Sequence, residues 1–418
     1  MEAIDAKKKN IVIVGAGFGG ITVALKLARN MGGLLSDYQI ILIDRHHHQL
    51  YTPALYEIAS IPNENITDVA LKTSILIPIA DIVAGKPITA LTDEIVGLAA
   101  DTKKVLLKKS GALPYEFLII ALGSETNYFN IPGLTEHSLP LKNFDDALRL
   151  RNTIEEKVKK DGHIKIVVGG AGSSGVELIA EFVNFVCAIK EKVLGGKQIC
   201  NAEFLLVEGT PEILPGFDAW TIKKTKRRLA RLGIRIKTSA AISAVEEREI
   251  IFKNGERESY DILCWTGGVR GPAIFSQFGF PLSQKGGLEI EETLHIKGAD
   301  RSLFAIGDNA SFINPKTGKP LVWNVPIAEA EGRVVAQNII RTIRNEPLRR
   351  FVPLKKYPFI LAVGKKYAIA DLLIIRICGF WGWFLKQLVE LRYLLFILPI
   401  KKAIRTWLRG EKYFMSND

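Results

Sequence analysis

The chain has 418 residues, of which 48% are hydrophobic and 24% charged, and this composition excludes a disordered chain and predicts about two to three globular domains. Its four cysteines form no C-x-x-C pair, so neither a redox dithiol nor a zinc site is indicated. The net charge is +12, and the residues from Arg341 onward hold 16 Lys and Arg against 5 Asp and Glu, so nearly all of it lies in the last fifth of the chain.

The first strong pattern lies near the start of the chain. Residues 11–14 read as an apolar β-strand, and Gly15, Gly17 and Gly20 then follow the spacing G-x-G-x-x-G at the start of a helix. These glycines allow a tight turn, close approach of a diphosphate, and close packing of helix on strand. The next strand, residues 38–43, ends in Asp44, where an acid binds ribose hydroxyls. The combination predicts a dinucleotide site.

The next hundred residues contain no second motif of this strength. His46, His47 and His48 are adjacent, and we interpret them as a polar loop near the cofactor rather than as a metal site. Residues 80–120 alternate short apolar runs with turn residues, which predicts a β-meander. That region ends in a buried strand that closes on Gly123.

The opening pattern then recurs. After an apolar strand at residues 165–168, Gly170, Gly172 and Gly175 repeat the glycine spacing, and the strand at 204–207 ends in Glu208. Two copies predict two dinucleotide sites. A carboxylate at Glu208 accepts hydrogen bonds from both ribose hydroxyls and repels a 2′-phosphate, which favours NADH over NADPH.

Two later segments complete the pattern. Residues 221–233 form a basic helix, which we interpret as solvated surface. A strand at 302–306 then leads to Gly307 and Asp308. Asp308 either binds the ribityl hydroxyls of a flavin or caps the helix that follows, and the presence of two nucleotide sites favours the flavin.

These landmarks together resemble the flavoproteins with two dinucleotide-binding domains, and within them the membrane-associated type II NADH dehydrogenases. The features that narrow the resemblance include Gly-Phe-Gly-Gly at 17–20, Ile-Leu-Pro-Gly-Phe at 213–217 and Trp-Thr-Gly-Gly-Val-Arg at 265–270. The resemblance implies an α/β fold with two Rossmann-like domains, for FAD and NADH, and a C-terminal amphipathic membrane-anchoring region. The expected boundaries are 1–155 and 263–345 for the FAD domain, 156–262 for the NADH domain and 346–418 for the membrane region.

The resemblance also implies which residues form each site. Glu177 matches a carboxylate beside the nicotinamide and the flavin, where it stabilises the hydride-transfer geometry or relays a proton. The residues implied to bind NADH are Gly170, Gly172, Ser173, Gly175, Glu177, Glu208, Gly267 and Gly268. The residues implied to bind FAD are Gly15, Gly17, Phe18, Gly19, Gly20, Asp44, Arg45, Thr52, Ala121, Gly123, Gly307, Asp308, Pro326, Ile327 and Ala328. No metal is implied.

One departure from the family concerns the electron acceptor. The family usually carries two glutamines near the flavin that line its quinone site, and here Pro326 and Ala330 stand in their places. The expected activity is transfer of electrons from NADH through FAD to a membrane quinone, without ion pumping. The alternatives are the same flavoenzyme with a carrier protein, oxygen or a sulfur species as acceptor, and a redox-sensing protein that binds nucleotides without turnover.

The C-terminal tail suggests where the protein works. Charged residues interrupt the apolar run at 372–400, so a simple membrane span is not expected. From Ile400 the sequence is amphipathic, with Ile404, Trp407 and Leu408 on one arc and a set of Lys and Arg on another. This pattern is typical of a helix in the membrane interface, although a dimer interface or a packed helix also fits. We expect a peripheral protein on the cytoplasmic face of the cell membrane, with no nucleic-acid partner, and homodimerisation is an open possibility.

Overall fold

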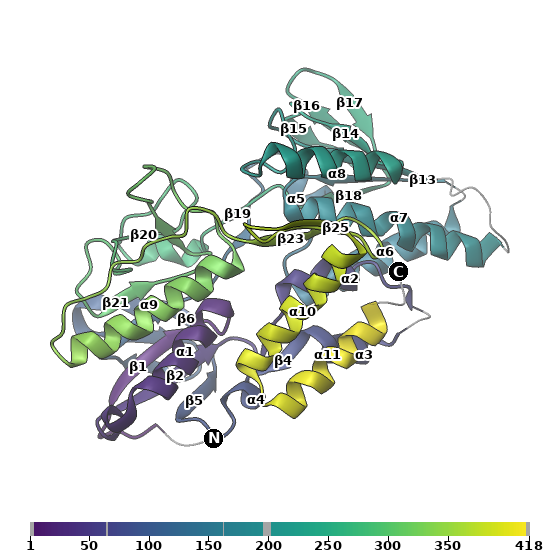
Figure 1. Cartoon of the computed structure of the whole chain (residues 1–418). Helices are drawn as coiled ribbons and strands as arrows, with labels where there is room; N and C mark the ends of the chain where they lie inside the picture. Colours follow the sequence, from purple (N-terminus) through teal and green to yellow (C-terminus); the bar gives the residue numbers. More distant parts are fainter. Residues whose placement is uncertain (1–3, 64–65, 162, 195–201, 415–418) are drawn as a thin grey trace. The chain divides into compact units, whose positions relative to one another are not determined.

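The computed structural model describes residues 4–63, 66–161, 163–194 and 202–414, and their contacts group the chain into two compact units (Figure 1). The first unit comprises Met1–Gln49, Ile77–Glu125 and Val269–Lys355. The second unit comprises Leu50–Leu76, Thr126–Gly268 and Lys356–Asp418. Short strands lie where the chain passes from one unit to the other: β3 (His48–Leu50), β4 (Leu76–Pro78), β10 (Glu125–Thr126) and β19 (Val269–Arg270).

The first unit is built on a parallel sheet of five strands in the order β21-β9-β1-β2-β5. Its strands are rich in β-branched residues, as expected for a sheet that is buried on both faces. Ile11 of the central strand lies beside Ile40 on one side and Phe117 on the other, and all three are buried. The strands are β1 (Lys9–Val14), β2 (Tyr38–Asp44), β5 (Ile88–Thr92), β9 (Phe117–Ile120) and β21 (Leu303–Ala305).

Two helices of the first unit pack closely against each other, α1 (Phe18–Asn30) and α9 (Val325–Ile343) (Figure 1). Gly332 permits this contact, because a Cβ there would lie 2.8 Å from the carbonyl oxygen of Gly19. The other strands are β6 (Ile95–Ala99), β7 (Lys104–Leu107), β8 (Gly111–Pro114), β20 (Leu288–Ile290) and β22 (Ala310–Phe312). The other helices are α4 (Ile79–Val83) and the 3₁₀ helices η1 (Gly32–Ser36), η4 (Ala100–Thr102) and η5 (Ala273–Gln277).

The second unit repeats this architecture. Its parallel sheet has the order β11-β18-β12-β13-β14, so that β12, β13 and β18 take the places of β1, β2 and β9. The strands are β11 (Leu139–Pro140), β12 (Ile164–Gly169), β13 (Ala202–Val207), β14 (Arg235–Lys237) and β18 (Ile262–Trp265). The helices around it are α5 (Leu134–His137), α6 (Phe144–Lys160), α7 (Ser173–Leu194) and α8 (Ala219–Arg231).

Further elements complete the second unit. An antiparallel sheet holds β15 (Ile242–Val245), β16 (Glu249–Phe252) and β17 (Arg257–Ser259). A second antiparallel sheet holds β23 (Phe359–Ala362), β24 (Ala368–Asp371) and β25 (Arg376–Gly379). The remaining helices are η2 (Thr52–Ala54), α2 (Leu55–Ile58), α3 (Asp68–Ile75), α10 (Phe380–Ile397) and α11 (Ile400–Phe414), and α10 packs against α11.

The expected α/β fold with two Rossmann-like sheets is confirmed. The β-meander is present as β6, β7 and β8, whereas β5 joins the main sheet in parallel with β2. In the described part of the chain, no helix is long and apolar enough to cross a bilayer. The domain boundaries drawn from the resemblance stay a prediction.

Candidate functional site

The first glycine turn brings the end of β1 against the end of β9. Gly15 has a φ of +105°, and a Cβ there would lie 2.2 Å from the carbonyl oxygen of Ala121. A Cβ at Gly20 would lie 1.9 Å from the carbonyl oxygen of Gly15. Gly17, in contrast, faces open space among the described residues and has no side chain to cap α1. The free N–H groups at this helix N-terminus therefore suit the diphosphate of a dinucleotide.

The acid at the end of β2 is fixed by the same turn. Asp44 Oδ2 accepts a hydrogen bond from the N–H of Ala16 at 2.7 Å, and Oδ1 accepts one from the N–H of His46 at 2.8 Å. Each carboxylate oxygen has a second lone pair, so it remains able to accept a bond from a ribose hydroxyl. Arg45 follows on the surface, and Phe18 and Gly19 are buried in the first turn of α1.

A second turn of the first unit carries Gly307 and Asp308. The N–H of Gly123, after β9, donates to Asn309 Oδ1 at 3.1 Å, and Asn309 Nδ2 donates to the carbonyl oxygen of Ile120 at 3.2 Å. This bridge holds the ends of β9 and β21 at one edge of the sheet. Asn309 is fully buried. The position of Asp308 is therefore set by its neighbour, which the sequence pattern did not single out.

The alternative that Asp308 caps a helix is wrong. The element after Asp308 is strand β22, and the next helix, α9, is capped by Asn324, whose Oδ1 accepts a bond from the N–H of Ile327 at 3.0 Å. Pro326 lies in the first turn of α9, as expected, and is exposed. Ala328 is buried and approaches the 307–308 turn, since a Cβ at Gly307 would lie 3.3 Å from its Cβ.

A buried carboxyl group supports this turn. Glu331 of α9 is 2% exposed, and its Oε2 accepts a bond from the N–H of Gly307 at 2.7 Å. Burial raises the pKa of Glu331 to about 8, and the nearby Asp308 adds to the rise, although the Gly307 N–H opposes it. Glu331 therefore carries a proton at neutral pH. Sequence reasoning missed it, because a glutamate in a helix is ordinarily solvated.

The second glycine turn, in the second unit, reproduces the first. Gly170 has a φ of +98°, and a Cβ there would lie 2.4 Å from the Cα of Gly267. A Cβ at Gly175 would lie 1.9 Å from the carbonyl oxygen of Gly170, whereas Gly172 faces open space among the described residues. The structure thus brings the 170–175 turn and the loop that holds Gly267 and Gly268 together at the end of β12.

Glu208 occupies the place in the second unit that Asp44 has in the first. Its Oε2 accepts a bond from the N–H of Ala171 at 2.8 Å, and its Oε1 accepts one from the N–H of Thr210 at 2.9 Å. The two acids therefore make the same pair of backbone contacts. Ser173 is exposed at the first position of α7, beside the open turn.

Glu177 lies one turn further along α7. Its Oε1 accepts a bond from the N–H of Ala362 in β23 at 3.3 Å. Burial raises the pKa of Glu177 to about 8, the Lys386 ammonium opposes the rise and the Glu57 carboxylate adds to it. Glu177 thus carries a proton at neutral pH and titrates close to it.

Lys386 and Glu57 form an ion pair within the second unit. Their side chains are only 14% and 12% exposed. The Glu57 carboxylate holds the pKa of Lys386 above its usual range although burial lowers it. Burial also raises the pKa of Glu390, one turn further along α10, to about 8. Lys386 is therefore a buried cation close to Glu57, Glu177 and Glu390, and of these Glu177 and Glu390 keep a proton at neutral pH.

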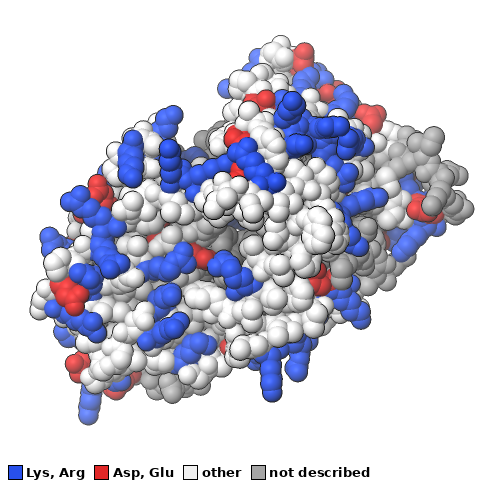
Figure 2. Space-filling view, viewed as in Figure 1, with Lys and Arg blue, Asp and Glu red and all other residues white. Residues whose placement is uncertain are grey.

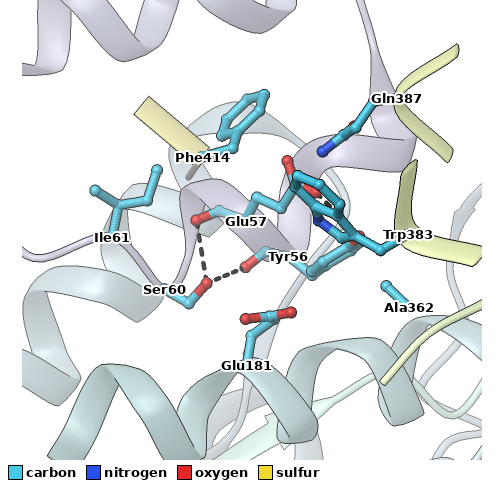
Figure 3. A pocket seen from close by; sticks show the side chains of 9 residues that line it. All are labelled: Tyr56, Glu57, Ser60, Ile61, Glu181, Ala362, Trp383, Gln387 and Phe414. Atoms are coloured by element: carbon cyan, nitrogen blue, oxygen red, sulfur yellow. Dashed lines mark hydrogen bonds between the residues drawn. The ribbon is translucent and has the colours of Figure 1, made fainter. Parts of the chain in front are cut away.

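A narrow pocket lies next to this pair (Figure 3). Glu57 Oε2 and Gln387 Oε1 are buried there without a hydrogen bond from the described residues. Buried polar atoms of this kind are commonly satisfied by ordered water. The residues that line the pocket come from α2 and the turn after α2, and from α7, β23, α10 and α11. They are Tyr56, Glu57, Ser60, Ile61, Glu181, Ala362, Trp383, Gln387 and Phe414.

Neither cysteine that the structure describes as free provides a reactive thiol. Cys264 is buried in β18, and burial raises its pKa well above the usual range. Cys378 in β25 is partly exposed, and burial raises its pKa as well. Because the thiolate is the nucleophile, both groups are poorly suited to sulfur chemistry.

Thr52 and the side chains of the three adjacent histidines lie apart from the two glycine turns and their acids in the contacts that the structure describes. Thr52 is exposed in η2 and belongs to the second unit, whereas the other residues implied for FAD belong to the first. His46 and His47 each lie against the ring of His48, and no group of three metal-ligating side chains occurs in the parts of the chain that are described.

Comparison with known proteins gives consistent results. Type II NADH:quinone oxidoreductase from Staphylococcus aureus strain MSSA476 is 26% identical over 396 residues, covering 92% of this chain and 95% of the relative. The same protein from strain bovine RF122 is 27% identical over 355 residues, which cover 82% of this chain and 85% of the relative. These relatives confirm the resemblance to type II NADH dehydrogenases.

Solved structures confirm the fold. NDH2 from Plasmodium falciparum in complex with NADH has a TM-score of 0.82 at 20% identity and covers 98% of this chain and 99% of its own. The sulfide:quinone oxidoreductase from Aquifex aeolicus has a TM-score of 0.75 at 19% identity, and the match covers 97% of this chain and 92% of the solved one. The family model described as pyridine nucleotide-disulphide oxidoreductase matches residues 9–332. The chain therefore belongs to the pyridine nucleotide-disulphide oxidoreductase family.

Proposed function

We propose that the chain is an NADH:quinone oxidoreductase with FAD as its resident cofactor and without ion pumping. The observation that carries the proposal is the duplicated geometry, in which Asp44 and Glu208 make the same two backbone contacts beside two open glycine turns. Two such sites in one chain suit one bound dinucleotide that accepts a hydride and one that delivers it. The names of the relatives support NADH as donor and a quinone as acceptor.

The residues of the first unit fit FAD. The N-terminus of α1 at Gly17 suits its diphosphate, Asp44 suits its ribose, and Asp308 suits its ribityl hydroxyls. The backbone at Pro326, Ile327 and Ala328 begins α9, and the positive end of this helix dipole favours negative charge. When bound, FAD supplies the two-electron chemistry, and these residues bind and orient it.

The residues of the second unit fit NADH as substrate. The turn at Gly172 and Ser173 leaves room for a diphosphate at the start of α7. Glu208 accepts hydrogen bonds from the ribose hydroxyls of NADH, and its charge opposes a 2′-phosphate. Gly267 lies directly beside the turn, since a Cβ at Gly170 would lie 2.4 Å from its Cα, and the lack of side chains at Gly267 and Gly268 suits close approach of a cofactor to the backbone.

Glu177 is the proposed catalytic residue. Reduction of a quinone by NADH consumes one proton from solution, because the hydride brings one hydrogen and the quinol holds two. A carboxyl group whose pKa is near 8 holds a proton at neutral pH and releases it readily, as a general acid requires. Lys386 and Glu57 tune this group from the side of α10 and α2.

A quinone is favoured over a sulfur acceptor because the free thiols of Cys264 and Cys378 are held protonated. Pro326 and Ala330 carry no amide groups, so the quinone contacts must differ from those of the family's glutamine pair. No contact among the described residues separates a quinone from the other two candidate acceptors, oxygen and a carrier protein. The experiment below distinguishes them.

The proposed location is the cytoplasmic face of the cell membrane. Ile400, Ile404 and Leu408 of α11 are 68%, 42% and 55% exposed, so this apolar stripe is not packed on the second unit. Lys401 and Arg405 lie beside the stripe and are also exposed. An exposed apolar stripe with flanking cations suits an anionic membrane surface, and a homodimer that covers the stripe is the competing proposal.

Anaerobic mixing of the FAD-loaded protein with NADH tests the first half of the proposal, because bleaching of the flavin absorbance reports hydride transfer. Steady-state NADH oxidation with a short-chain quinone in detergent tests the second half. We expect bleaching followed by reoxidation on addition of quinone. Flavin that stays reduced with quinone but is reoxidised by oxygen or a carrier protein would overturn the acceptor. Failure to bleach would support a nucleotide-binding sensor.

A further inference from the structure

The turn between β24 and β25 exposes an unusually apolar tip. Residues 372–375 read Leu-Leu-Ile-Ile, and Leu373, Ile374 and Ile375 are 49%, 94% and 57% exposed. We call these three residues the apolar tip. Exposed apolar side chains are ordinary when they stand singly, whereas a contiguous group usually marks an interaction site.

The backbone of the apolar tip is held in a conformation that its side chains do not favour. Leu373 has a φ of +75°, a region that glycine and asparagine adopt readily and leucine rarely does. The N–H of Leu372 donates to the carbonyl oxygen of Ile375 at 2.9 Å, which closes the turn. A turn with polar or glycine residues would form here with less strain, so the apolar side chains need an explanation outside folding.

A network of charges fixes the apolar tip to the body of the second unit. Asp371 is fully buried, accepts bonds from Lys356 at 2.7 Å and from the N–H of Leu373 at 2.9 Å, and pairs with Arg376 at 3.0 Å. Burial opposes ionisation, but these donors hold the pKa of Asp371 below its usual range. The base of the tip is therefore fixed to the body of the second unit.

The same network connects the apolar tip to the basic helix α8. Asp218 caps α8 and pairs with Lys356 at 3.2 Å and with Arg376 at 3.5 Å. The Arg376 guanidinium lies over the ring of Trp220, 5.1 Å from its centroid. Basic side chains thus begin at the base of the tip and continue along α8.

The exposed positions of α8 carry positive charge. Lys223, Arg227 and Arg231 are exposed at intervals of four residues, which places them on one face, while Thr221 and Leu229 are buried. Figure 2 shows Lys and Arg gathered over α8, and a largely uncharged area over α10 and α11. An apolar projection beside an aromatic ring and a basic helix face has the composition of a membrane-interface element.

We propose that the apolar tip inserts into an anionic lipid bilayer while the basic face of α8 binds the lipid headgroups. This is a second attachment point, distinct from the amphipathic stripe of α11, and it rests on the membrane location given under the proposed function. The charge selects lipid as the occupant, because a row of cations beside a small apolar wedge matches the phosphates above a hydrocarbon layer. Fixing of the base of the tip by Asp371 and Asp218 suits insertion, since the turn loses less ordering entropy on binding than an unsupported loop would.

Binding of the FAD-loaded full chain to vesicles tests the proposal. The probes are vesicles of phosphatidylcholine with and without phosphatidylglycerol, assayed by sedimentation. Ile374→Ser should weaken binding to the anionic vesicles about tenfold, since one exposed isoleucine loses its transfer from water to hydrocarbon. Val322→Ser is the matched control, because Val322 is an exposed apolar residue of the first unit. Anaerobic flavin bleaching by NADH should be unchanged in both variants.

A second variant locates the apolar tip directly. Ile374→Trp should show vesicle-dependent quenching by brominated lipid beyond that of the unsubstituted protein. Unchanged vesicle binding of Ile374→Ser together with no extra quenching in Ile374→Trp would overturn the tip and leave the α11 attachment intact. No binding of the unsubstituted protein to any vesicle would overturn the membrane location itself. Loss of a dimer in Ile374→Ser, seen by light scattering, would replace lipid with a second copy of the chain.

Discussion

Replacement of Glu331 by glutamine provides a sharp test of the structure around the proposed flavin site. Glu331 is 2% exposed and accepts a bond from the N–H of Gly307. Its pKa of about 8 means that the folded protein keeps this group neutral at pH 7. Glutamine has nearly the same shape and is neutral at every pH. Glu331→Gln should therefore be about as stable as wild type below pH 4.5, where the carboxyl group is neutral in both states. At pH 7 the variant should be more stable by about 3 kcal/mol, because its folding takes up no proton.

The effect of pH follows from the direction of the shift. The unfolded carboxyl group ionises near its usual pKa of 4.5, whereas the folded group holds its proton until about pH 8. The contribution of this proton to stability is complete below pH 4.5 and is lost as the pH rises through 8. Between pH 7 and pH 9 the wild-type chain should lose about 1.4 kcal/mol of unfolding free energy at this site, from one pH unit of difference in proton binding. Glu331→Gln should not show this loss.

The assay is urea unfolding of the FAD-loaded protein at pH 7 and pH 9, followed by circular dichroism and by release of flavin fluorescence. Glu292→Gln is the matched control, because Glu292 is an exposed carboxylate of the same unit paired with Arg350. The control should keep the wild-type dependence on pH. A Glu331→Gln variant that loses as much stability as wild type between the two pH values, or that is several kcal/mol less stable at pH 7, would refute the assignment of a neutral Glu331.

Four further predictions concern the reaction. Glu177→Gln should lower the rate of quinone reduction about a hundredfold at pH 7 and abolish the fall in rate that wild type shows as the pH rises through about 8, as measured by stopped-flow pH profiles. Gly170→Ala should raise the KM for NADH more than about tenfold without loss of FAD, since its Cβ meets the backbone of Gly267. Glu208→Gln should reduce the preference for NADH over NADPH in kcat/KM by about tenfold. Cys264→Ala should leave quinone reductase activity within about twofold, and a larger loss would revive the sulfur chemistry.

The features that the sequence predicted correctly are the two glycine turns and the acids at the ends of the strands that follow them, which depend on local backbone geometry. Gly15 and Gly170 are required by sterics, because a Cβ at either position would overlap another strand end. Asp44 ends β2 and Glu208 directly follows β13, so their positions could be read from the ends of the apolar strands that follow the glycine turns. Both features are local in sequence, and each needs a narrow set of residue types, glycine in the turn and a carboxylate after the strand.

The parts that the sequence did not predict depend on contacts between distant segments. Glu57 and Lys386 are 329 residues apart, and nothing in either local pattern indicates that they pair. Glu331 was hidden because a glutamate in a helix is ordinarily solvated, and only the packing of α9 against α1 shows that it is buried. Asn309 stood beside Asp308, yet the family pattern draws attention to the aspartate.

The two repeats differ in the buried charged groups that lie near them. In the first unit a buried carboxyl group, Glu331, supports the backbone of the Gly307 turn, and no cation among the described residues contributes to its raised pKa. In the second unit the helix that starts at the turn carries Glu177 towards a buried cation, Lys386, and its partner Glu57. A neutral carboxyl group fixed to the backbone suits a site that holds its cofactor permanently. A carboxyl group balanced between a cation and an anion suits a site where charge changes in each turnover, and we therefore propose that the proton chemistry lies with the second repeat.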